Sequence, residues 1–137
     1  MTKIGLFGIG LDTYWNQFAG LLDNLNSYQQ IIKKRILEFG VEVIDAGMVD
    51  NPVKAQDAAE LFKKSDVEMV FLYVSTFALS STVLPVAQKV KVPIIILNLQ
   101  PVSSLDYKSF NALGDKGKMT GVYERHQFFV NLNFKKR

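Results

Sequence analysis

The sequence contains no cysteine and a single histidine, His126. Without cysteine the chain can form neither a disulfide framework nor a thiolate metal site. The lone histidine lies far along the chain from any paired carboxylates, which leaves no set of residues with metal-ligand spacing. Asp45 and Asp50 could together hold a hard cation, but capping and turn formation account better for two aspartates there. We therefore expect no metal, no cofactor and no catalytic residue in this chain, and a reducing, cytoplasmic environment.

Long hydrophobic runs and a strong charge of one sign are also missing. No stretch approaches the roughly 20 apolar residues of a membrane-spanning helix, and the N-terminal segment turns polar by Asp12. The formal net charge is only +3, and the runs of adjacent basic residues lie in three separate places, at 33–35, 63–64 and 135–137. None of these groups is interleaved with aromatic residues, so they indicate solvated helix faces and a tail. We expect neither nucleic acid nor a membrane as a partner.

The glycines near the N-terminus do not complete a nucleotide-binding loop. Counting from Gly8, the position of the third glycine in a dinucleotide fingerprint is occupied by Thr13. Flavin binding needs several hydroxyls after the first strand, and Thr13 alone is available there. Receiver-type phosphotransfer needs an aspartate at the end of the third strand, where this chain has Val74 and Ser75. These nucleotide-dependent and phosphotransfer classes are therefore disfavoured.

The sequence does contain the alternating pattern of a parallel α/β domain, and 137 residues suffice for one domain with one core. Short apolar runs alternate with longer segments of helical periodicity, as in β-α-β units. The expected strands are Lys3–Phe7, Val41–Asp45, Met69–Val74 and Ile94–Leu97. We predict a three-layer α/β fold: a flavodoxin-like parallel sheet of four or five strands, in the order 2-1-3-4, with helices on both faces.

Three helices are expected between these strands. The first runs from about Asn16 to Phe39, and the second from an asparagine cap and proline at 51–52 to near Lys64. The third starts within 80–82 and tolerates Pro85 only in its first turn. The residues expected to face inward are Phe18, Leu21, Leu22, Leu25, Tyr28, Ile32, Ile36 and Phe39 in the first helix, Val53, Ala58, Leu61 and Phe62 in the second, and Val83, Val86, Ala87 and Val90 in the third.

Three loops leave the carboxyl ends of the predicted strands, at 8–15, 75–79 and 98–101. In a parallel sheet of this order, ligands bind outside those carboxyl ends. The first loop holds the only tryptophan, Trp15, together with Tyr14 and Asp12, so a polar substrate could be stacked and hydrogen-bonded there. In the alternative interpretation, Tyr14 and Trp15 pack against the sheet edge.

Five blocks of sequence carry a resemblance to a known family. They are Leu11–Phe18 (LDTYWNQF), Asp45–Asp50 (DAGMVD), Phe71–Gln88 (FLYVSTFALSSTVLPVAQ), Leu97–Pro101 (LNLQP) and Phe110–Gly121 (FNALGDKGKMTG). In order and spacing they resemble the N-terminal domain of L-arabinose isomerases and the related L-fucose isomerase-like proteins. The resemblance spans residues 3 to about 121. We therefore expect a sugar-isomerase N-terminal domain at 1–121 and a divergent C-terminal tail at 122–137.

The resemblance implies an aldose–ketose isomerase that uses a divalent cation, typically manganese, bound by glutamates and histidines of later domains. It implies a homo-oligomer in which this domain lends the loop after its first strand to the sugar pocket of a neighbouring subunit. The substrate would be a pentose or a 6-deoxyhexose. By matching position, the residues implied to bind the sugar are Leu11, Asp12, Thr13, Tyr14 and Trp15 in the loop, and Gln100, Asn111 and Lys118 on its rim.

The sequence leaves three functional interpretations open. The favoured one is the substrate-side and oligomerisation domain of a sugar isomerase, present as a fragment and inactive alone. After Gly121 only His126 keeps the register of the family, which favours a truncation, a frameshift or an altered end. The alternatives are a stand-alone flavodoxin-like module that binds or senses a small ligand such as a sugar, and an inert oligomerisation piece.

Overall fold

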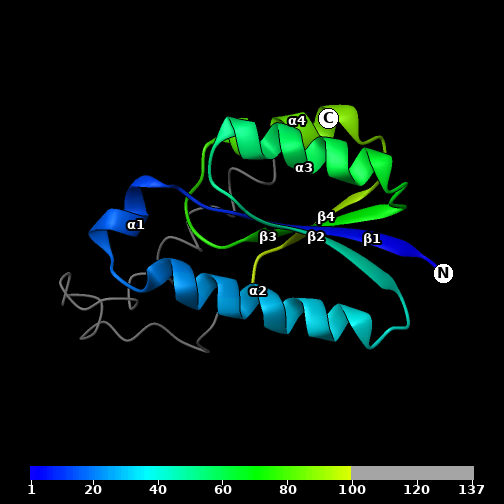
Figure 1. Ribbon diagram of the computed structural model, residues 1–137, viewed down its shortest axis with the longest axis horizontal. Helices are drawn as coiled ribbons and strands as arrows, with labels where there is room; N and C mark the ends of the chain where they lie inside the picture. The colour runs from blue at the N-terminus through cyan, green and yellow to red at the C-terminus, as the bar shows by residue number, and fades with distance from the viewer. Residues whose placement is uncertain (100–137) are drawn as a thin grey trace.

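Four parallel strands form the centre of the structure, a computed structural model that describes residues 1–99. The sheet order is β2-β1-β3-β4, and helices cover both faces (Figure 1). Helix α2 (Leu21–Leu37) lies on one face, whereas α3 (Pro52–Lys64) and α4 (Leu84–Lys89) lie together on the other. The strands are β1 (Lys3–Ile9), β2 (Glu42–Val49), β3 (Met69–Val74) and β4 (Ile94–Leu97). The predicted three-layer α/β fold with strand order 2-1-3-4 is confirmed.

Strands β1 and β2 both extend further than the sequence pattern predicted. Strand β2 continues past Asp45 because a bulge inserts one extra residue between the pairs Leu6–Asp45 and Gly8–Met48. Gly47, within this bulge, has a φ of 74°, a backbone conformation that glycine adopts at little cost. As a result, β2 delivers Asp50 to the carboxyl edge of the sheet, beside the end of β1.

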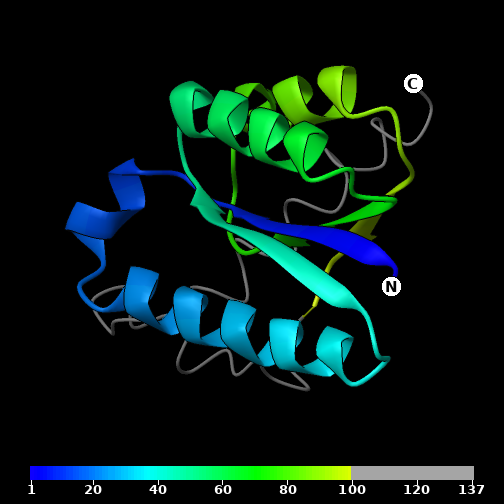
Figure 2. The same ribbon diagram turned by 45° about the vertical axis from the view of Figure 1, so that its right-hand side comes forward.

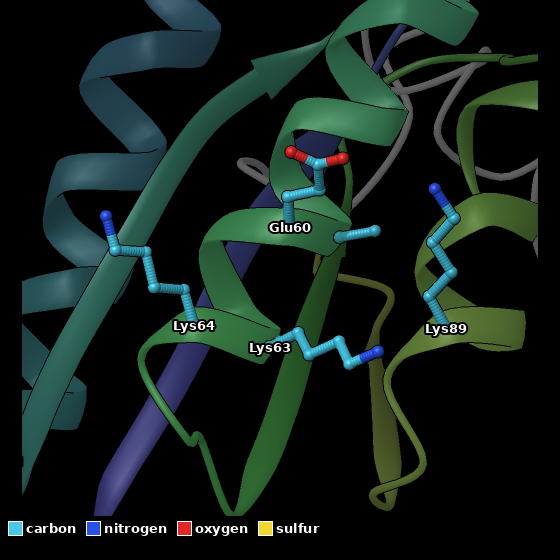
Figure 3. A pocket seen from close by; sticks show the side chains of 5 residues that line it. Glu60, Lys63, Lys64 and Lys89 are labelled. Atoms are coloured by element: carbon cyan, nitrogen blue, oxygen red, sulfur yellow. The ribbon is translucent and has the colours of Figure 1, made fainter.

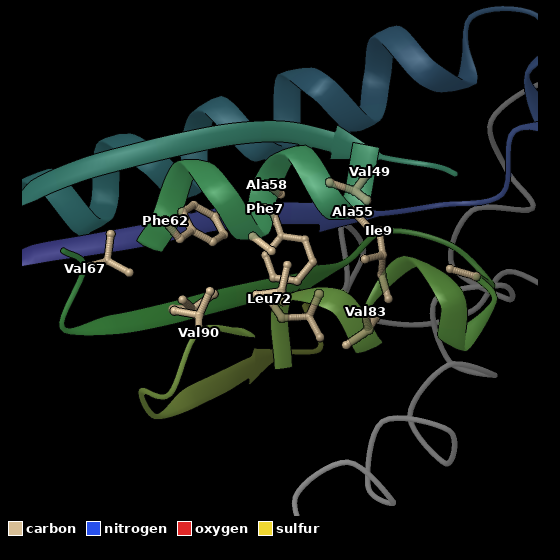
Figure 4. Packing of buried hydrophobic residues seen from close by; sticks show 14 of the residues in the cluster. Phe7, Ile9, Val49, Ala55, Ala58, Phe62, Val67, Leu72, Val83 and Val90 are labelled. Atoms are coloured by element: carbon tan, nitrogen blue, oxygen red, sulfur yellow. The ribbon is translucent and has the colours of Figure 1, made fainter. Parts of the chain in front are cut away.

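The larger part of the core lies between the sheet and the α3–α4 layer (Figure 4). The rings of Phe7 and Phe62 pack at a centroid separation of 5.9 Å. Gly5 makes this packing possible, because a Cβ at that position would lie 2.9 Å from ring atoms of Phe62. On the opposite face, α2 covers the sheet with a smaller cluster that consists of Ile4, Leu6, Ile32, Ile36 and Tyr73.

The predicted first helix, from Asn16 to Phe39, is divided in two. Residues Thr13–Gln17 form the short helix α1, and α2 begins only at Leu21. Between them Gly20 adopts a left-handed conformation with φ of 82°, which ends the first helical segment and redirects the chain. At the other end the helix stops at Leu37, so Phe39 lies outside it and is 83% exposed rather than facing inward.

Helix α3 begins as predicted: the Asn51 side chain caps it by accepting a hydrogen bond from the Lys54 backbone N–H at 2.8 Å. The expected inward placement of Val53 and Leu61 is wrong, because these residues are 70% and 38% exposed. The stripe that packs inward consists instead of Ala55, Ala58, Ala59 and Phe62, at spacings of three and four residues. Its small alanine side chains let α3 lie close to the sheet and to α4.

The third predicted helix consists of a 3-10 turn, η1 (Ser80–Thr82), followed by α4. Pro85 falls in the first turn of α4, where its missing N–H removes no helical hydrogen bond, as predicted. Val83, Val86 and Val90 are buried in the core. Within residues 1–99, no helix combines the length and apolar character needed to cross a membrane. The predicted boundary at 121 and the tail at 122–137 lie outside the described residues.

Candidate functional site

The carboxyl ends of β1, β2 and β3 meet at one edge of the sheet, next to α1 (Figure 2). The chain leaving β1 is fastened there by the first residues after β3. Ser75 donates its backbone N–H to the Ile9 carbonyl at 3.2 Å, and Thr76 Oγ1 accepts the N–H of Leu11 at 3.3 Å. Because Ser75 and Thr76 are fully buried, the start of the first loop is held in a fixed position.

Trp15 links this loop to the end of β2. Its indole N–H donates to Asp50 Oδ2 at 2.8 Å, across 35 positions of sequence. Its ring lies against Gly10, where a Cβ would come within 2.8 Å of the ring atom Cη2. The structure therefore places Trp15 against the sheet edge, as in the alternative interpretation of the sequence. Tyr14 is half-buried, and its ring meets that of Phe18 edge-on at 6.1 Å.

Asp50 is a buried carboxylate at this edge with three polar partners. It is 9% exposed, and besides Trp15 it pairs with Lys54 Nζ at 2.9 Å and accepts from Asn51 Nδ2 at 3.4 Å. Burial by itself raises the pKa of Asp50, but the hydrogen bonds from Trp15 and Lys54 and the charge of Lys54 outweigh it. The pKa of Asp50 is lowered as a result, so the carboxylate stays ionised at neutral pH.

The remaining predicted residues of the loop point to solvent to different degrees. Asp12 and Thr13 are exposed, and Leu11 is half-buried. Asp12 stands at the N-terminal cap of α1 but makes no side-chain capping hydrogen bond, so its carboxylate remains open to solvent. The structure thus brings Leu11, Asp12, Thr13, Tyr14 and Trp15 together at the carboxyl edge. Gln100, Asn111 and Lys118, also predicted to bind the sugar, lie outside the described residues.

A cleft that the sequence analysis missed lies beside Asp50. It has a volume of about 400 Å³ and runs between α2 and the first turn of α3, and we call it the α2–α3 cleft. Its lining residues are Leu22, Asn26, Gln29, Gln30, Gly47, Met48, Asp50 and Lys54. One signal in the sequence could have pointed to it: Gln29 interrupts the apolar stripe formed by Leu25, Ile32 and Ile36, and it is only 2% exposed.

A second groove, of about 500 Å³, lies between α3 and α4 (Figure 3). Glu60, Lys63 and Lys64 from α3 and Lys89 from α4 line it together with Ala59. The three lysines are exposed, and Lys89 donates to the Gln56 side chain. The prediction that Lys63 and Lys64 belong to a solvated helix face is confirmed. None of these charged side chains is buried, so the groove shows no built binding site.

The strand order defines the class of protein, a three-layer α/β domain with a flavodoxin-like sheet, and Trp15 and Asp50 meet at its carboxyl edge. No protein-family model matches the chain, and a search of curated proteins finds no match either. Within residues 1–99, no three acidic side chains gather closely enough to hold a metal ion.

Proposed function

We propose that the chain is the substrate-side and oligomerisation domain of a cytoplasmic aldose–ketose sugar isomerase, similar to L-arabinose and L-fucose isomerases. The five sequence blocks support this family. The single observation that carries the sugar-binding role is the arrangement at the carboxyl edge. Asp12 and Thr13 are exposed there, while the nearby Trp15 is held by its hydrogen bond to Asp50. In a loop held in position, a carboxylate can accept hydrogen bonds from the hydroxyls of a sugar, and a hydroxyl can donate to them or accept from them.

The manganese that the family implies does not fit the described residues. Residues 1–99 contain no histidine, and their acidic side chains form no cluster of three or more. The carboxylates of Asp45 and Asp50 each accept hydrogen bonds and have a lysine partner. We therefore assign the chain a binding role at the rim of a sugar pocket, completed by a neighbouring subunit, and no part in proton transfer.

Sugar binding by the isolated chain tests this proposal. In the full 137-residue chain, we expect nuclear magnetic resonance saturation transfer from protein to L-arabinose or L-fucose. Asp12→Asn removes the exposed charge and should weaken the transfer, because a hydrogen bond to a charged partner becomes a neutral one. Asp57→Asn, an exposed change on α3 away from the loop, is the matched control. Equal transfer in both variants would remove Asp12 from the site.

One observation favours the second candidate, a stand-alone module that binds or senses a small ligand. The α2–α3 cleft is formed entirely within residues 1–99 and needs no neighbouring subunit. The genomic DNA downstream of the coding sequence separates the two candidates. An in-frame or one-base-shifted isomerase remainder supports the isomerase domain, whereas a clean stop followed by an unrelated gene supports the module.

A further inference from the structure

We propose that the α2–α3 cleft is a second binding site, which takes a small, neutral, polyhydroxylated molecule. This site is distinct from the 11–15 loop. It goes beyond the proposed function, because one chain forms it alone whether or not the chain belongs to an isomerase. Its volume of about 400 Å³ falls in the range of small-molecule sites.

Hydrogen bonds hold the side chains on both walls of the cleft in place before any ligand binds. Asp50, at the α3 side, is held by Trp15 and Lys54, and Gln29, at the α2 side, donates its amide N–H to Asp45 Oδ1 at 3.0 Å. Asp45 in turn accepts the backbone N–H of Gly47 at 2.8 Å, so the bulge of β2 forms the floor between them. Side chains fixed by such networks lose little freedom when a ligand binds.

Gln29 provides the observation that points to a ligand. It is 98% buried, since only 2% is exposed, yet its carbonyl oxygen Oε1 has no hydrogen-bond partner within the described residues. Oε1 lies against Gly8, where a Cβ would come within 2.4 Å of it. The amide N–H of Gln29 has a structural partner in Asp45, so the unpaired carbonyl oxygen is the part that a structural role does not explain. Gln29 lines the cleft, so a ligand hydroxyl bound there would give Oε1 the partner that the described residues do not supply.

The charges around the cleft select a neutral ligand. Asp50 pairs with Lys54 at 2.9 Å, and Asp45 has Lys33 at 4.0 Å, so each carboxylate already has its cation. An added phosphate would meet both carboxylates, and an added amine would compete with the lysines. The exposed amides of Asn26 and Gln30 offer both donors and acceptors, and Leu22 and Met48 supply apolar walls. That combination suits a polyol, with hydroxyls and a C–H face.

The direct test is a titration of the full chain with ribitol, followed through the side-chain amide resonances of Asn26, Gln29 and Gln30. Saturable shifts are expected with ribitol, and none with inorganic phosphate or putrescine. Saturable shifts with phosphate or putrescine but not ribitol would overturn the assigned ligand chemistry. No saturable shift with any of the three probes would overturn the site itself.

Three variants separate binding from structure. Gln29→Met should weaken ribitol binding about tenfold, the effect of one lost hydrogen bond, and should also lower the thermal midpoint, because it removes the donor to Asp45. Asn26→Leu, an exposed change in the cleft, should also weaken binding. Asn24→Leu, exposed on the same helix but outside the cleft, should not. The inference fails if Asn26→Leu binds ribitol like the unmodified chain, and this comparison holds even if Gln29→Met does not fold.

The cleft and the sugar-isomerase proposal can fail separately, and a titration with L-arabinose distinguishes them. Shifts confined to the backbone amides of 11–13 with L-arabinose would support that proposal and contradict the cleft. Shifts confined to the cleft amides would support the cleft and contradict a sugar role for the loop.

Discussion

Trp15 and Asp50 join two segments that leave neighbouring strands, and one hydrogen bond of 2.8 Å connects them. The acceptor is a carboxylate of a residue that is 9% exposed, so this hydrogen bond contributes more to stability than one at the surface. Lys54 balances the charge from the first turn of α3. The position of the 11–15 loop therefore depends on a side chain 35 residues away.

Replacing Trp15 by phenylalanine tests this dependence. Trp15→Phe keeps an aromatic ring over Gly10 but leaves Asp50 with one donor fewer, so we expect a loss of about 1–3 kcal/mol in the free energy of unfolding. Urea unfolding followed by far-ultraviolet circular dichroism measures it. Phe39→Leu, at an aromatic residue that is 83% exposed, should have almost no effect. A Trp15→Phe variant as stable as the unmodified chain would show that the bond contributes nothing.

The ionisation of Asp50 predicts a dependence of stability on pH. The pKa of Asp50 is lowered in the folded chain: burial opposes this, and the bonds from Trp15 and Lys54 outweigh it. A group with a lowered folded pKa stabilises the fold above its unfolded pKa, about 3.9, and loses that contribution as the pH falls through the folded value. Asp50→Asn should therefore be less stable than the unmodified chain at neutral pH.

The difference in unfolding free energy between the two chains should stay constant down to about pH 5 and shrink below about pH 4. Urea titrations at a series of pH values measure it. A difference that grows as the pH falls would mean that the folded pKa is raised instead. Asp57→Asn, at an exposed position of α3, is the control.

The helical break at Gly20 separates the 11–15 loop from the long helix α2. Gly20 has a φ of 82°, and a Cβ there would meet nothing within 4 Å. Gly20→Ala therefore tests the backbone conformation without a steric clash. We expect a loss of about 1 kcal/mol in unfolding free energy, the cost of a left-handed conformation for a residue with a side chain.

Thermal unfolding of Gly20→Ala gives the measurement, with Asn24→Ala in the exposed part of α2 as the control. Alanine is the better helix former at position 24, so the control should be as stable as the unmodified chain or more stable. If Gly20→Ala is as stable as the Asn24→Ala control, then the segment from Asn16 to Phe39 can form one continuous helix, as the sequence pattern predicted.

The strands and caps could be predicted because their signals are local. The apolar runs, the Asn51 cap and Pro85 each act through neighbours in sequence. The break at Gly20 and the bulge at Gly47 could not be predicted. Glycine adopts positive and negative φ about equally well, and tertiary contacts determine which sign it has in the fold. The buried face of α3 could not be predicted either. It depends on how the helix packs against the sheet, which buries the alanines and leaves Val53 and Leu61 exposed.

The candidate site was predictable only in its location. The strand order implies that the 8–15 loop lies at the carboxyl edge, and the structure places it there. The partner of Trp15 was not predictable, because Asp50 reaches the edge through the bulge of β2. The α2–α3 cleft likewise depends on how two helices on opposite faces meet the edge strand.

For the whole molecule, the account predicts that the chain alone does not interconvert aldoses and ketoses. Residues 1–99 hold no cluster of metal-binding side chains, and the full sequence has one histidine and no cysteine. An assay with L-arabinose and L-fucose, in the presence of manganese or cobalt, should show no product above buffer. Turnover that survives repeated purification would contradict the proposed rim role.

Contact between the 11–15 loop and a sugar can be tested by a residue-by-residue chemical-shift map of the full chain. With L-arabinose or L-fucose, we expect saturable shifts of the backbone amides of Leu11, Asp12 and Thr13. The amides of Lys63 and Lys89, in the exposed groove between α3 and α4, should not move. The claim is contradicted if the loop amides stay still at about 100 mM sugar, a hundred times the upper end of ordinary KM values.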